Sequence, residues 1–323
     1  MDSNLSIIVI GGLNTDIVAL GAKKLLKSGE HTYADKLHIG AGGKSRNIAQ
    51  MIAALSIKKN VAMMGKSSKD PFGLWKFPID SLKEAGVNIE YVTIASFEET
   101  KQFPGIALIP VDKQGRNQIY VLPGINNEFL SKDIDNASNL FQTIAKNKGM
   151  LVLTLELPCQ TALYAIKKAN KLDIKVLFDP GGIDEEQNYT ELLKQNIYLL
   201  KPNEHEATVL TGVEVNDYKT SKKAAEKMLQ QGVQNVFITI GSQGGYFFNN
   251  KIEKHIPIPD IKASNTKDET GCGDQAMATF AVAINEGKTE IEAATTAILA
   301  GTLQFYNPGI QPVTRSDLKK YEK

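Results

Sequence analysis

The sequence predicts an α/β protein: a mostly parallel sheet flanked by helices, with a small additional β element. Three observations predict this fold class. Residues 6–10 form a short apolar run that ends in two glycines, which is typical of a strand buried on both faces. From residue 150 onward, strand-like runs alternate with segments of helical period, as in a parallel sheet covered by helices. Two further β-type runs flank a glycine-containing turn at residues 112–115 and indicate a hairpin.

The first part of the chain supplies the start of the sheet and the small β element. Residues 16–41 show no helical period, so short strands or loop are expected there. Residues 45–57 carry apolar side chains every three to four positions and predict a helix. We expect the small β element to be built from residues 15–41 and 99–123. The other elements predicted here are a strand at 61–64, a helix at 72–85 that Gly86 ends, and the hairpin runs 106–110 and 117–122.

The second part of the chain alternates strands and helices regularly. Because no repeat, low-complexity segment or Pro/Ser-rich linker interrupts it, we expect one domain over residues 1–323. Binding sites of parallel sheets lie beyond the carboxyl ends of the strands, so residues that directly follow strands are the first candidates for function. The predicted strands are 150–155, 174–178, 197–200 and 236–240, the helices are 159–172, 187–195, 203–211, 219–231, 272–287 and 290–305, and a second hairpin covers 245–256.

Composition excludes several classes of function. The 323 residues include 37 basic and 36 acidic side chains, a net charge of +1, which gives no electrostatic footprint for nucleic acid or an acidic membrane. No apolar run approaches the roughly 20 residues of a membrane helix, and the N-terminus lacks the basic region of a signal peptide. Two cysteines favour a reducing, cytoplasmic location. Four scattered histidines argue against a histidine-rich zinc site.

The sharpest motif is Asp268-Glu-Thr-Gly-Cys-Gly-Asp274, directly before an apolar helix. Glycines at a helix start let backbone N–H groups face outward, where they and the helix dipole attract an anion such as a phosphate. An aspartate in the first turn would be repelled by that anion. Its presence is explained if its task is to take a proton from a hydroxyl that attacks the phosphate. The alternative is a glycine-rich turn in which Asp274 merely favours the dipole.

A second glycine turn, Gly40-Ala-Gly-Gly-Lys-Ser-Arg-Asn47, opens the helix predicted at 45–57. It is not a Walker A loop, because that motif needs a glycine where His38 stands. The turn at Gly43 brings backbone close to a ligand, while Lys44 and Asn47 offer donors to hydroxyl groups. The alternative is an ordinary junction of loop and helix with a solvated basic turn.

Polar residues follow the first and middle strands. Asn14 and Asp16 come after the strand at 6–10, and a buried carboxylate there can accept two sugar hydroxyls; the alternative is an Asx-turn. Glu156, after the strand at 150–155, is either a second substrate carboxylate or a solvated side chain.

Two later strand ends bear candidates for nucleotide binding. Asn203 and Glu206 have the spacing of a capping box, so a purely structural role is favoured there. The turns of residues 239–245 are flexible enough for a nucleotide to approach the backbone.

Together and in this order, these segments resemble the ribokinase (PfkB) family of sugar and nucleoside kinases. The similarity spans almost the whole chain. It implies an ATP-dependent kinase with a Rossmann-like three-layer α/β core and a β-sheet lid, which the β segments at 15–41 and 99–123 would form. The motifs are Asn14-Thr-Asp16, Gly42-Gly43-Lys44 with Asn47, Leu122-Pro-Gly-Ile-Asn126, Glu156, Pro202-Asn203-Glu204, Leu210-Thr211-Gly212, Thr239-Ile-Gly241 and Gly271-Cys-Gly-Asp274.

The resemblance implies a role for each matching residue. Asp274 would be the catalytic base, and the backbone of Gly271, Cys272 and Gly273 would hold the γ-phosphoryl group. Glu206 would lie near Mg²⁺. A K⁺ site beside this anion hole is a further hypothesis. The remaining roles are sugar binding by Asn14, Asp16, Gly43, Lys44, Asn47 and Glu156, ATP binding by Asn203, Glu206, Thr239, Gly241 and Gly244, and K⁺ binding by Asp268, Thr270, Gly309 and Thr314.

The chain departs from the family pattern at several positions. Glu269 stands for the usual threonine and Cys272 for the usual alanine, whose backbone alone is required. Lys201 stands where asparagine is usual and is either a phosphate contact or a surface lysine. Ser45-Arg46 replaces the Gly-Ala of ribokinases. The run Arg46-Asn47-Ile48-Ala49 is similar to the pseudouridine-kinase branch, whereas Lys44 and Leu122-Pro-Gly are similar to ribokinases.

The resulting prediction is transfer of the γ-phosphoryl group of Mg·ATP to a hydroxymethyl group of a small sugar. A nucleoside kinase of the same family is the alternative, with Phe97, Phe103 or Tyr120 as walls for a base; these aromatics are otherwise core of the lid. A non-enzymatic binding protein would have no use for Asp274, and a Rossmann dehydrogenase needs a Gly-x-Gly-x-x-Gly that the first strand lacks. Exposed edges of an open lid predict a homodimer through it.

Overall fold

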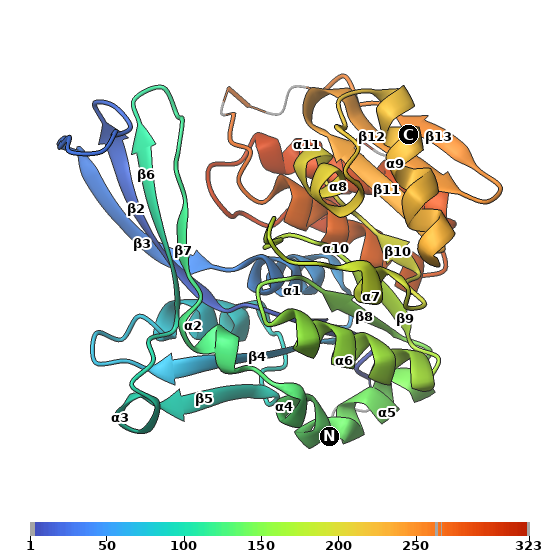
Figure 1. Cartoon of the computed structure of the whole chain (residues 1–323), viewed down its shortest axis with the longest axis horizontal. Helices are drawn as coiled ribbons and strands as arrows, with labels where there is room; N and C mark the ends of the chain where they lie inside the picture. Colours follow the sequence, from blue (N-terminus) through green and yellow to red (C-terminus); the bar gives the residue numbers. More distant parts are fainter. Residues whose placement is uncertain (1–3, 262–263, 266, 322–323) are drawn as a thin grey trace.

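The computed structural model describes residues 4–261, 264–265 and 267–321 and contains two separate sheets (Figure 1). The larger sheet has nine strands in the order β13-β12-β11-β10-β9-β8-β1-β4-β5. Strands β5 to β11 in this order are parallel, and β12 and β13 add an antiparallel edge. The strands are β1 (Ile7–Ile10), β4 (Val61–Lys69), β5 (Val92–Ser96), β8 (Met150–Leu153), β9 (Lys175–Phe178), β10 (Leu199–Leu200), β11 (Asn235–Ile240), β12 (Gly244–Asn249) and β13 (Glu253–Ile256).

Helices cover both faces of this sheet because its central strands are apolar on both sides. Ile7 and Val9 of β1 pack toward one helical layer, and Ile8 and Ile10 toward the other. The first layer contains α1 (Lys44–Leu55), α2 (Lys76–Ala85), α10 (Cys272–Asn285), α11 (Glu290–Phe305) and α12 (Arg315–Lys319). The second contains α4 (Ser131–Asn136), α5 (Ser138–Lys146), α6 (Cys159–Lys171), α7 (Thr190–Leu193), α8 (Glu204–Thr211) and α9 (Tyr218–Gln231).

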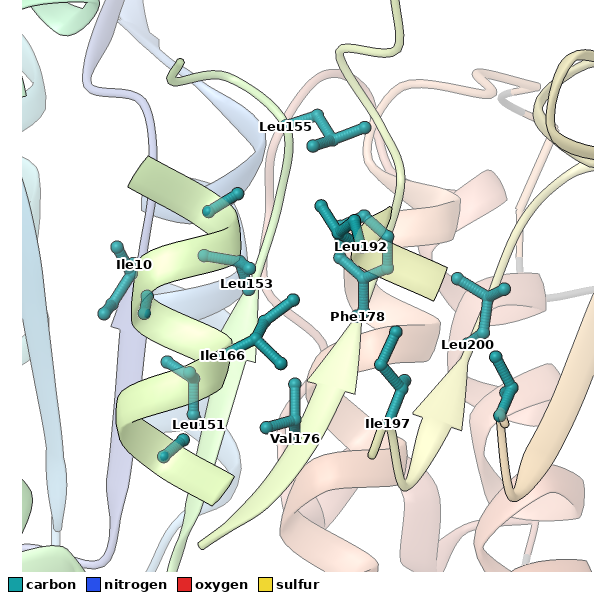
Figure 2. Close-up of a cluster of buried hydrophobic side chains, with 14 of the residues drawn as sticks. Ile10, Leu151, Leu153, Leu155, Ile166, Val176, Phe178, Leu192, Ile197 and Leu200 are labelled. Atoms are coloured by element: carbon teal, nitrogen blue, oxygen red, sulfur yellow. The ribbon is translucent and has the colours of Figure 1, made fainter. Parts of the chain in front are cut away.

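A cluster of buried apolar side chains lies under the second layer (Figure 2). Phe178 at the end of β9 packs among side chains of β8, α6 and α7 and has no exposed surface. This packing fixes the ends of β8, β9 and β10, from which the candidate site residues extend.

The smaller sheet has four strands in the order β3-β2-β6-β7 and projects away from the core (Figure 1). Its strands are β2 (Asn14–Ala22), β3 (Lys36–Gly42), β6 (Gly105–Asp112) and β7 (Tyr120–Leu122). Strands β2 and β6 pair in parallel, and the other two pairs are antiparallel. A short helix, α3 (Phe97–Thr100), precedes β6, and the 3₁₀ helix η1 (Gly124–Glu128) follows β7.

The predicted fold class is confirmed: a mostly parallel sheet flanked by helices, plus a separate small sheet. Both predicted hairpins form, at β6–β7 and β12–β13. Sequence reasoning did not find β5, α4, α5 or α12. It placed the start of α2 at residue 72, but the Asp70 carboxylate accepts hydrogen bonds from the N–H groups of Phe72 and Trp75 and holds that stretch as a turn. The helix predicted at 187–195 is reduced to α7.

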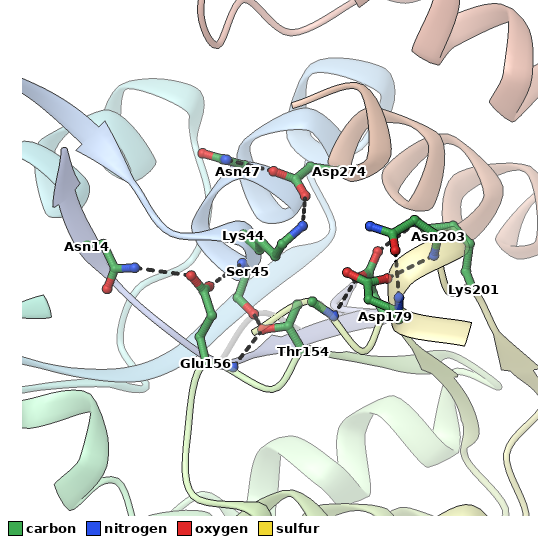
Figure 3. Close-up of polar contacts among 12 residues, drawn as sticks. Asn14, Lys44, Ser45, Asn47, Thr154, Glu156, Asp179, Lys201, Asn203 and Asp274 are labelled. Atoms are coloured by element: carbon green, nitrogen blue, oxygen red, sulfur yellow. Dashed lines mark hydrogen bonds and ion pairs between the residues drawn. The ribbon is translucent and has the colours of Figure 1, made fainter. Parts of the chain in front are cut away.

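Five strand ends meet along one edge of the larger sheet and position the site. The chain leaves β1 toward Asn14, β8 toward Glu156, β9 toward Asp179, β10 toward Lys201 and β11 toward Gly241. Helices α1 and α10 begin at the same edge, so their first turns face these strand ends (Figure 3). Within the described part of the chain, no helix has the length and apolar character needed to cross a membrane.

Candidate active site

Asp274 lies at the centre of the site, in the first turn of α10. Its side chain is almost fully buried, with 4% of its surface exposed. The Asn47 amide donates a hydrogen bond of 2.7 Å to Oδ2, and the Lys44 ammonium lies 3.6 Å from Oδ1 (Figure 3). The first turns of α1 and α10 therefore meet at one carboxylate.

The turn before Asp274 is built from glycine for geometric reasons. Gly271 has φ of +75°, and a Cβ there would stand 2.6 Å from Ile310 Cδ1. The helix begins at Cys272, so the N–H groups of this turn have no carbonyl four residues earlier within the helix. The Cys272 N–H donates to Glu269 O at 3.3 Å, within the turn itself. Burial raises the pKa of the Cys272 thiol to about 12, with the nearby Asp268 adding to the shift, so the thiol is protonated and unreactive.

Lys44 is held in place by charge and by close packing. Asp274 raises the pKa of Lys44 well above its ordinary value, against the effect of burial, and Asp179 adds to the increase. The lysine side chain lies across Gly181, where a Cβ would come within 2.3 Å of Lys44 Cδ. Only glycine at position 181 leaves room for this lysine.

Asn14, Glu156 and Asn126 form a hydrogen-bonded group beside Lys44. The Asn14 amide donates to Glu156 Oε1 at 3.1 Å, and Asn126 Nδ2 donates to Asn14 Oδ1 at 2.8 Å. The Ser45 N–H lies 3.4 Å from Glu156 Oε2. Burial raises the pKa of the Glu156 carboxyl to about 7, although Lys44 opposes the shift. Glu156 is partly exposed, but these contacts hold its carboxylate against Asn14 and Ser45, so it is not a freely solvated side chain.

Asp16, on β2, adds a second carboxylate to the part of the site formed by Asn14, Glu156 and Asn126. Burial raises its pKa, while the charge of Arg46 acts in the opposite direction. The carboxylate packs against the backbone of Gly42, where a Cβ would lie 1.8 Å from Oδ1. Gly43, with φ of +93°, is equally restricted, because a Cβ there would come within 2.8 Å of Gly12 O.

Arg46 is buried, not part of a solvated basic turn. Only 2% of its surface is exposed, and it donates to the carbonyl groups of Ala41 and Gly42 and to the side chain of Gln50. Burial lowers its pKa to about 10, so the guanidinium stays charged at neutral pH. It therefore joins α1 to the end of β3.

Asp179 and Lys201 form a second buried ion pair at the neighbouring strand ends. Their Oδ2 and Nζ atoms are 2.8 Å apart, and both side chains are at most 3% exposed. Burial acts to raise the pKa of Asp179, but Lys201 and Lys44 hold it below its ordinary value. Lys201 Nζ lies 3.7 Å from where a Cβ of Gly273 would stand, so the lysine faces the turn before Asp274. The surface-lysine alternative for Lys201 is wrong.

The predicted capping box is confirmed at the start of α8. Asn203 Oδ1 accepts from the Glu206 N–H at 2.8 Å, and the Glu206 carboxylate accepts from the Asn203 N–H at 2.9 Å. Glu206 is also buried, with 6% exposed, and burial and the charge of Asp179 raise its pKa. Both carboxylates thus lie near Lys201.

Thr239, Gly241 and Gly244 lie around the turn that links β11 to β12. Thr239 pairs with Asn203, so this turn adjoins the capping box. Gly241 has φ of +29° and begins a short 3₁₀ helix. At Gly244, a Cβ would lie 2.2 Å from Ile256 O, so the close approach that requires glycine there is to β13.

Three of the four residues implied for K⁺ lie together. Asp268 accepts from the N–H groups of Thr270, at 2.9 Å, and Gly309, at 2.8 Å. Thr314 is occupied elsewhere: its hydroxyl caps α12 and donates to Asp317 Oδ2 at 2.6 Å. The structure brings the first three together but gives Thr314 a different role.

Comparison with known proteins identifies the family. The model of the pfkB family of carbohydrate kinases matches residues 4–315. The chain belongs to this family. It is therefore a sugar kinase, a phosphotransferase that acts on an alcohol group.

Several relatives of this kinase are ribokinases. It is 31% identical over 278 residues to the ribokinase of Mus musculus, and the aligned region covers 85% of this chain and 80% of the mouse protein. It is 30% identical over 277 residues to the deoxyribokinase of Salmonella typhi, covering 86% and 85%. The structure of Arabidopsis thaliana ribokinase, complexed with ribose and ATP, matches with a TM-score of 0.83 at 27% identity over 98% of each chain. That of Thermotoga maritima ribokinase matches with a TM-score of 0.82 at 30% identity over 98% of each chain.

Sequence reasoning noted four further residues of this kinase's site without assigning their structural roles. Asp179 and Lys201 directly follow strands, so they could be expected near the site, but the ion pair between them could not be predicted. The sequence around Arg46 indicated only a basic turn, and Asn126 was noted only as the last residue of a family motif. Burial decides the role of each, and burial depends on the packing of segments distant in sequence.

Glu156→Gln is expected to stabilise the kinase at alkaline pH. The carboxyl pKa rises from 4.5 in the unfolded chain to about 7 in the folded protein, so between these values the folded state binds the extra proton. The free energy of unfolding of the native protein therefore falls as pH rises through this interval. The variant does not lose this stability, because glutamine does not titrate. Urea denaturation should show a gain at pH 8 that exceeds the gain at pH 5 by ~2 kcal/mol.

The exposed Glu84→Gln is the matched control and should shift the free energy of unfolding by less than about 0.5 kcal/mol at either pH. An equal effect of Glu156→Gln at pH 5 and pH 8 would contradict the raised pKa.

Proposed function

We propose that this kinase transfers the γ-phosphoryl group of Mg·ATP to the hydroxymethyl group of a pentose such as ribose, in the cytoplasm. The observation that carries the proposal is the buried Asp274, held between Asn47 and Lys44 at the N-terminus of α10. The relatives named ribokinase and deoxyribokinase, and the ribose and ATP of the Arabidopsis complex, support a pentose and ATP as the substrates.

Asp274 acts as the general base. Its carboxylate takes the proton of the attacking hydroxyl as the new O–P bond forms, and the bond from the γ-phosphorus to ADP breaks. Asn47 and Lys44 orient the carboxylate, and Lys44 also balances its charge.

The turn at Gly271, Cys272 and Gly273 stabilises the transferred group. Backbone N–H groups at a helix N-terminus carry positive partial charge and cost no reorganisation when negative charge develops. Lys201 faces this turn and adds a full positive charge, which Asp179 holds in position. Backbone N–H groups and the Lys201 ammonium thus lie together at the turn that would hold the phosphoryl group.

The sugar lies against Asn14, Asp16, Gly43, Asn47 and Glu156. These side chains offer carboxylate acceptors and amide donors, as vicinal hydroxyls require. Asn47 Oδ1 is buried without a hydrogen-bond partner among the described residues, a costly state that a sugar hydroxyl would relieve. Closure of the four-stranded sheet over the sugar would exclude water, which otherwise hydrolyses ATP.

ATP lies along Asn203, Thr239, Gly241 and Gly244, with Mg²⁺ near Glu206. Among the described residues, no group of three or more His, Cys, Asp or Glu side chains is arranged to hold a metal ion. This suits Mg²⁺, which binds one or two carboxylates together with substrate phosphates and water. The buried Glu206, with Asp179 as its neighbour, supplies such carboxylates. Mg²⁺ would neutralise charge on the phosphates.

The four-stranded sheet has the side-chain pattern of a dimer interface. Its register aligns Ile39, Ile17, Leu108 and Tyr120 in one row across all four strands. Asp16, one position along β2, points to the opposite face. Leu108 and Tyr120 are 40% and 59% exposed, so the row is apolar and open to solvent. We propose that a second copy covers it, giving a homodimer.

Asp274→Asn is expected to lower kcat by at least ~10²–10⁴, the usual contribution of a general base, with the fold unchanged. The matched control in the same turn is Cys272→Ala, which keeps the backbone N–H and should stay within several-fold of the native kcat. A coupled assay for ADP release measures both, with circular dichroism as the check on folding. Near-native turnover of Asp274→Asn would remove this residue from its role.

A substrate panel separates the sugar and nucleoside alternatives. Ribose and 2-deoxyribose should be phosphorylated with higher kcat/KM than fructose, adenosine or pseudouridine. Phe97 and Phe103 pack against each other, with ring centroids 4.9 Å apart, and Phe103 stacks on Phe72. These rings are engaged as a cluster of their own, which favours the sugar. A preference for adenosine or pseudouridine would establish the nucleoside kinase instead.

Leu108→Lys is expected to convert the dimer into a monomer, because a charge in the centre of the apolar row would be buried on association. Sedimentation velocity measures the change. Ile57→Lys is the control, since Ile57 is 81% exposed and lies on the core outside the row. A native protein that sediments as a monomer at all concentrations would refute the interface.

A further inference from the structure

Gln304 occupies the region that the family resemblance assigns to a monovalent cation. Its side chain has no exposed surface, and its amide nitrogen donates to Thr270 O at 3.2 Å and to Gly309 O at 2.6 Å. These carbonyl groups belong to two of the residues implied for K⁺. The amide therefore already bridges oxygens that an ion there would bind.

Several other oxygens of this region have donors of their own, whereas Gln304 Oε1 is buried without a hydrogen-bond partner among the described residues. Both carboxylate oxygens of Asp268 accept backbone N–H groups, from Thr270 and Gly309. The Asp268 carbonyl accepts the Cys272 thiol at 3.6 Å, and the Phe305 carbonyl accepts the Asp268 N–H at 2.9 Å. The region thus resembles a closed hydrogen-bond network more than a cage of free oxygen ligands.

These residues do not fit K⁺. A potassium site replaces the hydration shell of the ion with several oxygens directed at one point. At that point this chain directs an NH₂ group, whose two hydrogens face the same carbonyls that would bind the ion. A nitrogen 2.6 Å and 3.2 Å from the two oxygens leaves no space for an ion between them.

We propose that the Gln304 amide takes the place of the monovalent cation, so that this kinase works without K⁺. The amide joins the loop 268–271 to the loop 307–310. Its nitrogen also lies 3.8 Å from where a Cβ of Gly271 would stand, directly beside the turn that precedes Asp274. Gln304 is thus a positioning residue: it holds the loop that presents the backbone N–H groups to the phosphate.

The neutral amide has a consequence for charge. A bound cation would add one positive charge beside the turn at Gly271, which the amide does not. The full positive charges at the site come from Lys44 and Lys201 instead, both held by buried carboxylates. Lys201 faces the turn before Asp274, so a positive charge lies beside this turn without a bound monovalent cation.

The first test uses the native protein in 100 mM KCl, NaCl or choline chloride, which have equal ionic strength. It rests on the proposed sugar-kinase activity, so initial rates with ribose are paired with the melting temperature, which needs no activity. An ion that binds only the folded state raises its stability by mass action. We expect rates within about twofold and unchanged melting temperatures in all three salts. Activation by K⁺ of roughly tenfold, or a higher melting temperature in K⁺ alone, would overturn the proposal.

The second test is Gln304→Ala, which removes the bridge and frees the Thr270 and Gly309 carbonyls. The variant should lose kcat in choline chloride and recover it in KCl, with a melting temperature that now rises with K⁺. A variant that folds, loses kcat and responds to K⁺ no more than the native protein would contradict a cation-replacing role.

Gln311→Ala is the matched control, because Gln311 is exposed and its amide bonds to Pro308 O at 3.1 Å in the same loop. It should behave as the native protein in each salt. If Gln304→Ala does not fold, the salt series on the native protein still decides the question. If no sugar is phosphorylated, the melting temperatures decide it separately from the proposed function.

Discussion

The structure of the site depends on the contact of Lys44 with Asp274, which joins the first turns of two helices 230 residues apart in the chain. Asp274 is buried and Lys44 is partly exposed, so the contact matters most for the carboxylate, because a buried carboxylate without a partner costs several kcal/mol. Asp179 and Lys201 repeat the arrangement at the next strand ends, and Asp179 also acts on Lys44. The two pairs form one network, in which removing a lysine would leave two carboxylates uncompensated. This constraint, more than any single hydrogen bond, fixes where α10 can begin relative to α1.

The sequence was sufficient for the fold class and for the meeting of several polar strand ends at one edge, because both follow from local rules. Strand ends of a parallel sheet share an edge, so Asn14, Glu156 and Asp179 could be expected to lie close together. The glycine turn before Asp274 could be placed at a helix start because an apolar period follows it. The burial of Arg46 and Gln304 could not be predicted, because nothing in the local sequence distinguishes a buried polar side chain from a solvated one. Their roles appear only when the folded chain places carbonyl groups, such as that of Thr270 against Gln304, within hydrogen-bond distance.

The site is less favourable for folding than the core beneath it, as a binding surface must be. The partly buried Glu156 has a raised pKa, and Asn47 Oδ1 lacks a partner among the described residues. Each would be better satisfied by a ligand hydroxyl than by the protein itself. The apolar packing around Phe178 carries no such defects and holds the strand ends from below. Stability is thus concentrated under the site, and unsatisfied polarity on top of it.

The four-stranded sheet links the site to the proposed interface through its two faces. Asp16 and Ile17 are consecutive in β2, so one points toward the sugar side and the other into the apolar row. Arg46 donates to the carbonyl groups of Ala41 and Gly42 at the end of β3, and its charge also acts on Asp16. A movement of β3 relative to α1 would therefore change both the position and the electrostatic environment of Asp16. A partner that holds the outer face of the sheet in place would also hold Asp16 in place, because the two faces of a strand are formed by consecutive residues of the same backbone and move together.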